Sequence, residues 1–227
     1  MRYAIGDIHG CIKTLEKLIN KIIQKDTNPQ FYSVGDLIDR GPDAKAVINF
    51  FMDLKMTYPV QIIRGNHEEM MLNTLFRGAE NWYFNGAEKT LHNFTNHSTH
   101  SETDLNKIIP EKYIRFISSL PYYIELEDYF IVHAGFNFAG NNPFEDTDAM
   151  VWTRTEENNP EFTNNKKIIH GHTPIPFQQI KMNIQNTIST IYNIDSGCVY
   201  LTFNDLGTLT ALNMDTLELI NLKNVDF

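Results

Sequence analysis

The sequence contains little cysteine and no long apolar run. Its 2 cysteines, Cys11 and Cys198, lie far apart and form no CxxC unit, so we predict neither a disulfide framework nor a zinc knuckle but two small buried side chains. No stretch approaches the roughly 18–20 apolar residues that span a bilayer. The opening residues MRYAIGDIHG also lack the apolar core of a secretory signal. We therefore expect a cytoplasmic protein with no membrane partner.

Basic residues are also scarce. The chain has 19 Lys and Arg against 28 Asp and Glu, which gives a formal net charge of −9. A nucleic-acid-binding protein needs a broad basic surface to displace counterions, so we expect no nucleic-acid partner. A phosphorylated substrate is still compatible with this charge, because a few arginines or metal ions can reverse the potential locally.

Short apolar runs alternate with amphipathic stretches in the first half of the chain. Strands are expected at 3–5, 31–34 and 60–63, and helices at 12–23, from about 43, and at 68–76. This order predicts a mostly parallel sheet with ligand chemistry at the carboxyl ends of its strands. Residues 80–120 are polar and helical in pattern, with solvent-facing histidines expected at His92, His97 and His100.

The second half is rich in strand patterns. Strands are expected at 122–132, 167–169, 192–194, 199–203, 208–213 and 217–222, with the last three forming an antiparallel meander. Hydrophobic residues make up 42% and charged residues 21% of the 227 residues, as in ordinary globular proteins. No linker is long enough to divide the chain. We predict one domain over 1–227, of the α/β (α+β) class: a four-layer sandwich of two packed mixed β-sheets flanked by helices.

Five short clusters place Asp, Asn or His within two residues of a glycine, at the end of an apolar run. They are GDIHG at 6–10, GDLIDRGP at 35–42, GNHE at 65–68, VHAG at 132–135 and GHTP at 171–174. Mixed oxygen and imidazole donors suit Mn²⁺, Fe or Zn²⁺ better than Ca²⁺ or Mg²⁺. Six such donors, one of them able to bridge, match what two metal ions about 3.5–4 Å apart require.

In their order and spacing the five clusters resemble the signature of the metallophosphoesterase superfamily. GDxxDRGP with GNHE is similar to the serine/threonine phosphoprotein phosphatase branch. The runs WYFNG at 82–86, VWTR at 151–154 and DSG at 195–197 resemble its bacterial and phage members, of the bacteriophage lambda phosphatase type. The resemblance extends from about residue 3 to 200. It departs from the bacterial WxxNGG run at Ala87, which stands in place of the second glycine.

This resemblance implies a dinuclear metal centre, with manganese the most active metal in vitro and iron or zinc as alternatives. The implied ligands are Asp7 and His9 for the first metal, Asp36 bridging both, and Asn66, His133 and His172 for the second. In such a centre the metals share a hydroxide that attacks phosphorus in line, with no phosphoenzyme intermediate.

The resemblance also assigns roles outside the ligand set. His67 resembles the general acid that protonates the leaving oxygen, and Asp39 the carboxylate that orients its ring. Arg40 and Arg154, together with Asn66, match the groups that bind the phosphate. We expect structural roles for Arg64 and His170. For Asp195 we expect either a hydrogen bond to a ligand histidine or a turn cap.

Several functions fit this signature. The first is a phosphatase for phosphoserine or phosphothreonine proteins, with broad activity on small phosphomonoesters as a variant. The second is a symmetrical bis(5'-nucleosyl)-tetraphosphatase. Its second motif lacks the carboxylate that Asp39 supplies here, which favours the protein phosphatase. The third is a pseudo-phosphatase that acts as a binding module, but the complete set of ligands, acid and arginines argues against it. The oligomeric state and regulatory partners stay open.

Overall fold

The computed structural model describes residues 1–95, 105–154, 157–203 and 205–227. Its N-terminal part consists of three strands, each followed by a helix, with β1 parallel to β2 and β2 parallel to β3. The carboxyl ends of parallel strands meet at one edge of a sheet, so the turns after these strands lie close together. The elements are β1 (Arg2–Ile5), α1 (Ile12–Lys25), β2 (Gln30–Ser33), α2 (Ala44–Leu54), β3 (Val60–Ile62) and α3 (Asn66–Arg77).

The rest of the chain completes this sheet and builds a second one. The five-stranded sheet has the order β3-β2-β1-β8-β9 and the four-stranded sheet the order β4-β5-β6-β7, and each combines parallel and antiparallel pairs. The remaining elements are η1 (Tyr83–Asn85), α4 (Ala87–Phe94), α5 (Leu105–Ile108), α6 (Glu111–Ser118), β4 (Tyr123–Glu125), β5 (Tyr129–Val132), α7 (Thr147–Trp152), α8 (Pro160–Thr163), β6 (Lys167–His170), α9 (Phe177–Gln185), β7 (Ile191–Asn193), β8 (Thr208–Asn213) and β9 (Leu219–Lys223).

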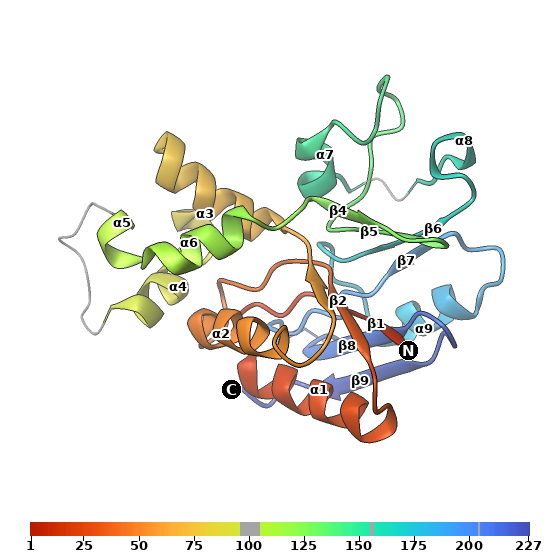
Figure 1. Cartoon of the computed structure of the whole chain (residues 1–227), viewed down its shortest axis with the longest axis horizontal. Coiled ribbons are helices and arrows are strands. Elements are labelled where there is room, and N and C mark those ends of the chain that lie inside the picture. The colour runs from red at the N-terminus through yellow and green to blue at the C-terminus, as the bar shows by residue number, and fades with distance from the viewer. Residues whose placement is uncertain (96–104, 155–156, 204) are drawn as a thin grey trace.

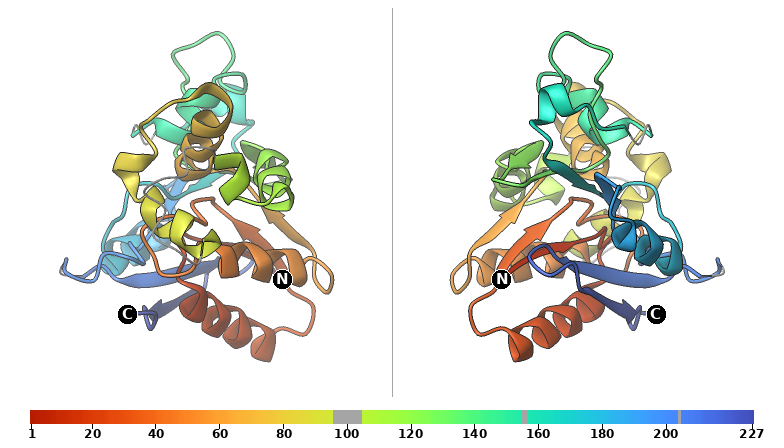
Figure 2. Two further views of the ribbon diagram at one scale, coloured as in Figure 1. Left: turned by 90° about the vertical axis from the view of Figure 1, so that its left-hand side faces the viewer. Right: turned by 90° about the vertical axis from the view of Figure 1, so that its right-hand side faces the viewer.

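Alternating side chains sort the core into layers. Tyr3 and Ile5 pack with the apolar faces of α1 and α2 on one side of the five-stranded sheet, whereas Ala4 between them packs against the other sheet. On the second sheet Ile131 faces the first sheet, and Phe130 faces an outer aromatic cluster. Helices α1 and α2 cover the outer face of the five-stranded sheet, and α7 lies beyond the second sheet (Figures 1 and 2). The predicted sandwich of two mixed sheets flanked by helices is therefore confirmed.

Two strand predictions are wrong. The expected strand over 122–132 is a hairpin, because the exposed Glu127 and Asp128 form a tight turn closed by the Leu126 N–H donating to the Tyr129 carbonyl at 2.8 Å. Residues 199–203 form turns rather than a strand, inside a loop closed by the Gly207 N–H donating to the Gly197 carbonyl at 3.0 Å. The predicted three-stranded meander is therefore a two-stranded β8–β9 hairpin.

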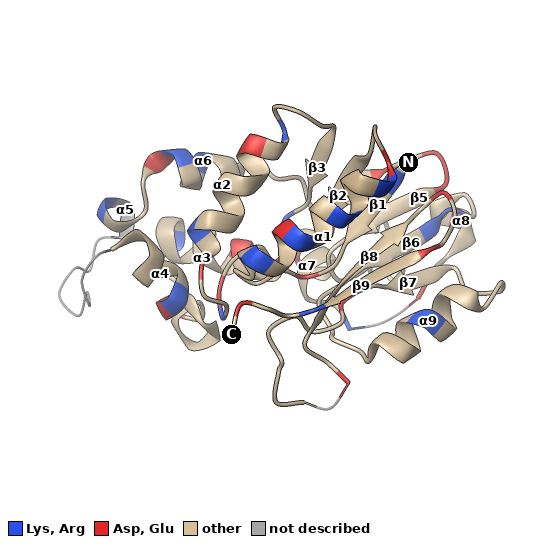
Figure 3. Ribbon diagram, turned by 90° about the horizontal axis from the view of Figure 1, so that it is seen from below, with Lys and Arg blue, Asp and Glu red and all other residues tan. Residues whose placement is uncertain are grey.

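The surface carries charges of both signs. Basic and acidic residues occur together on α1 and α6 (Figure 3). His92 is exposed, as predicted, whereas His97 and His100 lie outside the described residues. Cys11 and Cys198 are free and buried, also as predicted. Within the described ranges, every helix is too short or too polar to cross a membrane.

Candidate metal centre and active site

The predicted ligands come from both sheets and meet at the carboxyl ends of their parallel strands. Turns after β1, β2 and β3 supply one set and turns after β5 and β6 supply the other (Figure 1). The six residues are Asp7, His9, Asp36, Asn66, His133 and His172, all buried except the half-buried His172. The structure thus brings together all six positions that the resemblance pointed to, although they are spread over most of the chain.

The backbone of this region is strained. Positive φ angles occur at His9 (48°), Asp36 (50°), Asp39 (69°), Arg40 (66°) and His172 (69°). Left-handed conformations cost free energy for residues with a Cβ atom, and they persist only where the surroundings hold them. Five of the positive-φ residues that carry a Cβ atom are therefore gathered in three turns at this edge of the sheets, where the surroundings must hold them.

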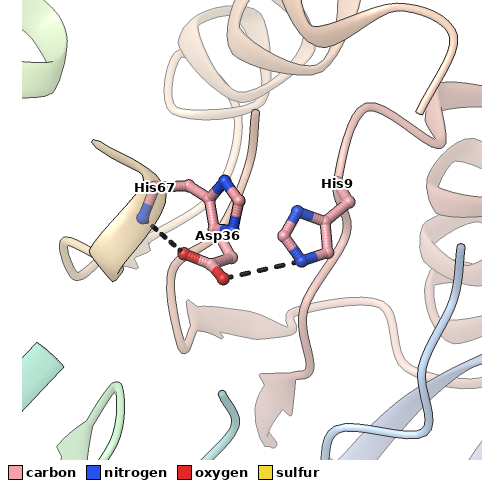
Figure 4. A group of neighbouring side chains, drawn as sticks. All are labelled: His9, Asp36 and His67. Atoms are coloured by element: carbon pink, nitrogen blue, oxygen red, sulfur yellow. Dashed lines mark hydrogen bonds and ion pairs between the residues drawn. The ribbon is translucent and has the colours of Figure 1, made fainter. Parts of the chain in front are cut away.

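Asp36 lies between histidines from the two sheets. Its Oδ2 is 3.5 Å from His9 Nε2 and its Oδ1 is 3.5 Å from His133 Nε2. The His67 backbone N–H donates to Oδ1 at 3.1 Å (Figure 4). The two carboxylate oxygens therefore face two different imidazoles, which is the placement that a carboxylate bridging two cations needs.

Backbone carbonyls orient two of the imidazoles. His9 Nδ1 lies 2.9 Å from the Ile38 carbonyl and His133 Nδ1 lies 2.8 Å from the Val34 carbonyl. Since a carbonyl only accepts hydrogen bonds, each Nδ1 carries the proton, and the lone pair of the neutral ring is on Nε2, directed into the site. Arg40 Nη1–H donates to that lone pair of His9 at 2.9 Å.

The second sheet and α3 form the other half of the site. Asn66 Oδ1 lies 2.9 Å from His133 Nε2 and 3.0 Å from His172 Nδ1. The His172 backbone N–H donates to Asp7 Oδ2 at 3.0 Å, which joins the two sheets directly at the site.

The donor set fits divalent metals. In neutral His133 the Nε2 lone pair faces the oxygen lone pairs of Asn66 Oδ1, an unfavourable contact that a shared cation would relieve. The separation of 2.9 Å between these two atoms is short enough for both to ligate one cation. Asp36 also belongs to two groups of donor atoms that lie within 4.8 Å of one another, one with His9 and His67 and one with Asp7 and His133.

Buried atoms without hydrogen-bond partners and the electrostatics of the site also fit the binding of divalent metals. Asp7 Oδ1 and His172 Nε2 are buried without a hydrogen-bond partner among the described residues. Burial, with the nearby Asp195 and Asp36 carboxylates, raises the pKa of Asp7 well above its usual range. Burial also lowers the pKa of His172 to about 3. Neutral imidazoles around crowded carboxylates leave a deficit of positive charge that metal ions would fill.

His67 and Asp39 form a buried pair beside Asp36. His67 Nδ1–H donates to Asp39 Oδ2 at 2.6 Å, and both side chains are at most 1% exposed. Burial lowers the pKa of His67, but the Asp36 charge and the Asp39 hydrogen bond outweigh burial and raise it. His67 Nε2 is buried with no hydrogen-bond partner in the described ranges, so it is available to a ligand.

The two predicted phosphate-binding arginines differ in their surroundings. Arg40 is half-buried at His9, and its guanidinium lies 5.7 Å from the Tyr200 ring centroid. Arg154 is exposed, and its charge contributes to lowering the pKa of His172. Arg40 thus contacts one of the proposed ligands, and Arg154 lies two residues after Trp152, whose ring centroid is 6.2 Å from that of His172.

Other sequence expectations are resolved by contacts. Arg64 donates to Glu69 at 2.9 Å and to the Ser118 carbonyl at 2.8 Å, in agreement with a structural role. Asp195 Oδ1 accepts the Gly197 N–H at 2.8 Å, so of its two possible roles the turn cap is observed.

Three residues at the site had no predicted role. Glu68 accepts four backbone N–H groups, and both Trp82 and Thr90 donate to Asp39. A signal existed for Glu68, because an acidic residue at the third helical position commonly closes a capping box. Trp82 belonged to a recognised run without an assigned function, and Thr90 gave no signal.

Comparison with known proteins identifies the family. The family model described as calcineurin-like phosphoesterase matches residues 3–203, and the chain belongs to this family. An asymmetrical bis(5'-nucleosyl)-tetraphosphatase of Geobacillus sp. is 28% identical over 97% of this chain and 93% of its own. Serine/threonine-protein phosphatase 1 of Salmonella typhimurium is 36% identical over 38% of each chain.

Solved structures agree on the fold. A crystal structure of a putative diadenosine tetraphosphatase superposes with a TM-score of 0.62 at 19% identity, covering 100% of this chain and 94% of its own. A protein serine/threonine phosphatase from Saccharomyces cerevisiae gives a TM-score of 0.62 at 16% identity, covering 100% and 80%. Metallophosphoesterases use a dinuclear metal centre, and the residues described above supply candidate ligands for one.

Proposed function

We propose that this chain is a metal-dependent phosphomonoester hydrolase that acts on phosphoserine or phosphothreonine in proteins. Asp7, His9 and Asp36 would hold one divalent metal, and Asp36 with the second group of ligands (Asn66, His133 and His172) would hold the other. When bound, the metals lower the pKa of a coordinated water and polarise the phosphoryl group. Manganese is the metal we expect to be most active in vitro, with iron or zinc as alternatives.

The observation that carries the proposal is the buried His67–Asp39 pair. A serine or threonine alkoxide is a poor leaving group and needs a proton as its bond to phosphorus breaks. His67 Nε2 is free to deliver that proton, because Nδ1 donates to Asp39 at 2.6 Å. The raised pKa of His67 favours the protonated ring that an acid requires.

Two arginines complete the binding of substrate. Arg40 donates Nη1–H to His9 Nε2 at 2.9 Å, so a metal on that nitrogen would release the N–H group for a phosphate oxygen. Arg154, exposed at the His172 side, can bind the remaining oxygens in bidentate fashion. Asn66 adds its side-chain N–H group as a further donor to phosphate.

A leaving-group series tests the role of His67. With Mn²⁺ present, we expect His67→Ala to lower kcat roughly 10²–10³-fold on phosphoserine peptides. The loss should shrink on p-nitrophenyl phosphate, whose phenolate leaves without a proton. Mn²⁺ binding, measured by calorimetry, should survive. An equal loss on good and poor leaving groups would show that His67 positions the site rather than donating a proton.

A second candidate is the hydrolysis of dinucleoside tetraphosphates. It is favoured by relatives that match nearly the whole chain and are named asymmetrical bis(5'-nucleosyl)-tetraphosphatases. Aromatic rings also border the site, since Tyr200 lies beside Arg40 and Trp152 is 6.2 Å from the His172 ring. Such rings could stack on the bases of a dinucleotide.

One substrate panel separates the two candidates. It compares phosphoserine, phosphothreonine and phosphotyrosine peptides, p-nitrophenyl phosphate and diadenosine tetraphosphate at one Mn²⁺ concentration. We expect the highest kcat/KM on the phosphoserine or phosphothreonine peptides. A kcat/KM at least tenfold higher on diadenosine tetraphosphate would overturn the protein phosphatase assignment in favour of a tetraphosphatase. The products, two diphosphates or a triphosphate and a monophosphate, would then distinguish symmetrical from asymmetrical cleavage.

A further inference from the structure

A short segment after α3 packs directly on the loop that carries Asp39. This segment, residues 82–94, contains η1 and α4, and we name it the bracket. Asn93 ties it to the loop, because its Oδ1 accepts the Ala44 N–H and its Nδ2 donates to the Pro42 carbonyl, both at 2.8 Å. Gly86 lies against Arg40, so closely that a Cβ atom at Gly86 would be 3.0 Å from Arg40 Cγ.

Two side chains of the bracket hold the Asp39 carboxylate. Trp82 Nε1–H donates to Asp39 Oδ2 at 2.7 Å, and Thr90 Oγ1–H donates to Oδ1 at 2.6 Å. The Asp39 backbone N–H in turn donates to Thr90 Oγ1 at 2.9 Å. Trp82 and Thr90 are both fully buried, so water does not compete for these bonds.

Asp39 needs such support for two reasons. Its φ of 69° is a left-handed conformation that an aspartate adopts only at a cost in free energy. In addition, Asp39 Oδ2 accepts both the Trp82 N–H and the His67 Nδ1–H. Trp82 therefore holds in place the same oxygen that orients the His67 ring. A rotation of the carboxylate would turn the His67 ring and move its Nε2 away from the leaving oxygen.

We propose that Trp82 and Thr90 are positioning residues for proton donation by His67, acting through the Asp39 carboxylate. The inference rests on the proposed function, because it requires His67 to protonate the leaving group. The inference extends the catalytic apparatus to the bracket, which contains no proposed metal ligand or phosphate-binding group. It also assigns a role to Trp82, the buried tryptophan of the WYFNG run.

The first test removes each donor. Thr90→Val keeps the side-chain shape but also removes the acceptor of the Asp39 N–H, and Trp82→Phe keeps an aromatic ring at the cost of volume. Phenyl phosphate has a poor leaving group, because its phenolate is a stronger base than p-nitrophenolate. With Mn²⁺, the kcat for its hydrolysis should fall about 10–100-fold, the usual loss when a supporting hydrogen bond at a site is removed. Hydrolysis of p-nitrophenyl phosphate should fall less than threefold. Thr90→Ser, which keeps the hydroxyl, is the matched control and should restore most of the phenyl phosphate activity.

A double-mutant cycle provides the second test. In a His67→Ala background, Thr90→Val and Trp82→Phe should have no further effect on phenyl phosphate, because the group they position is gone. Mn²⁺ affinity, measured by calorimetry, should stay within threefold of wild type in both single variants. Thr90→Val keeps the test decisive if the larger change at Trp82 prevents folding.

The outcomes separate the two proposals. Equal losses on both esters, or a further loss in the His67→Ala background, would overturn the positioning role while leaving the proposed phosphatase intact. If the wild-type protein with Mn²⁺ hydrolysed neither ester nor any phosphopeptide, the proposed function would fail and this inference with it.

Discussion

The buried Glu68 carboxylate accepts the backbone N–H of Asp36 at 2.9 Å, so it holds the main chain of the residue proposed to bridge two metals. The same side chain accepts N–H groups from Leu37 at 2.8 Å, Ile38 at 3.3 Å and Gly65 at 2.9 Å. Four donors on one side chain join the loop after β2 to the start of α3. Glu68 therefore shapes the centre of the site without facing the substrate.

Glu68→Gln should weaken metal binding. A glutamine presents one N–H₂ group to N–H donors, so two of the four hydrogen bonds are lost, either those from Asp36 and Gly65 or those from Leu37 and Ile38. Either loss weakens the loop that holds Asp36 in a left-handed conformation. We expect Mn²⁺ affinity to fall about 10–100-fold in calorimetry. Glu16→Gln, at an exposed position on α1, makes the same chemical change and should leave the affinity as in wild type. Equal affinity in all three proteins would contradict the role of Glu68.

Gly171→Ala should disrupt the site through steric contact. A Cβ atom on Gly171 would lie 2.0 Å from Asp7 Oδ1 and 2.8 Å from Val34 Cγ2, so Asp7 would have to move. We expect Mn²⁺ binding and hydrolysis to be lost, with a lowered melting temperature. Gly140→Ala is the control, because its Cβ would meet nothing closer than 3.8 Å. Normal Mn²⁺ binding by Gly171→Ala would mean that Asp7 is not a ligand.

Metal removal should abolish hydrolysis and lower stability. Ligands from both sheets would be joined by the metals, and a ligand that binds the folded state alone stabilises it by about 2.7 kcal/mol at a hundred times its Kd. We expect chelation to lower the melting temperature and Mn²⁺ to restore it. Asp36→Asn should reduce this Mn²⁺-induced rise most strongly among the ligand variants, since an amide cannot bridge two cations with a full charge. Turnover by protein shown to be free of metal would contradict the two-metal mechanism.

The metal-free protein should lose stability as the pH falls below about 6.5. Burial lowers the pKa of His172 to about 3, below its ordinary value of 6.5 in the unfolded chain. The unfolded state therefore binds a proton that the folded state does not, and His172 alone costs about 1.4 kcal/mol between about pH 7.5 and about pH 5.5. Urea denaturation in chelator should show this loss. It should be smaller in His172→Gln, and an unchanged pH dependence in that variant would contradict the assignment.

The sequence predicted the parts of the site that have a local signature. Each proposed ligand follows an apolar run and adjoins a glycine, except His133, whose nearest glycine is two residues away at Gly135, so placement at a strand end could be predicted from nearby residues. The sheet architecture could be predicted for the same reason. Alternation in β1 places Tyr3 and Ile5 toward the helices and Ala4 toward the other sheet.

The missed features depend on contacts between distant residues. Trp82 and Thr90 reach Asp39 across 43 and 51 residues, and no local pattern encodes that meeting. The run 199–203 has the composition of a strand, yet Leu201 is 47% and Phe203 61% exposed. Among the described residues no strand pairs with this run, so its strand propensity is not realised, and only the tertiary structure reveals this.

The hydrogen bond between the His172 N–H and Asp7 spans 165 residues, and this separation affects how the protein matures. Contacts between such distant residues form slowly, because a long loop must close before they gain any free energy. A nascent chain on the ribosome could present Asp7, His9 and Asp36 early, but the full coordination sphere would have to wait until β6 had been synthesised and docked. With the ligands proposed above, the second metal could bind only after β6 had been synthesised and docked, and a chain truncated before residue 172 would lack one of its proposed ligands.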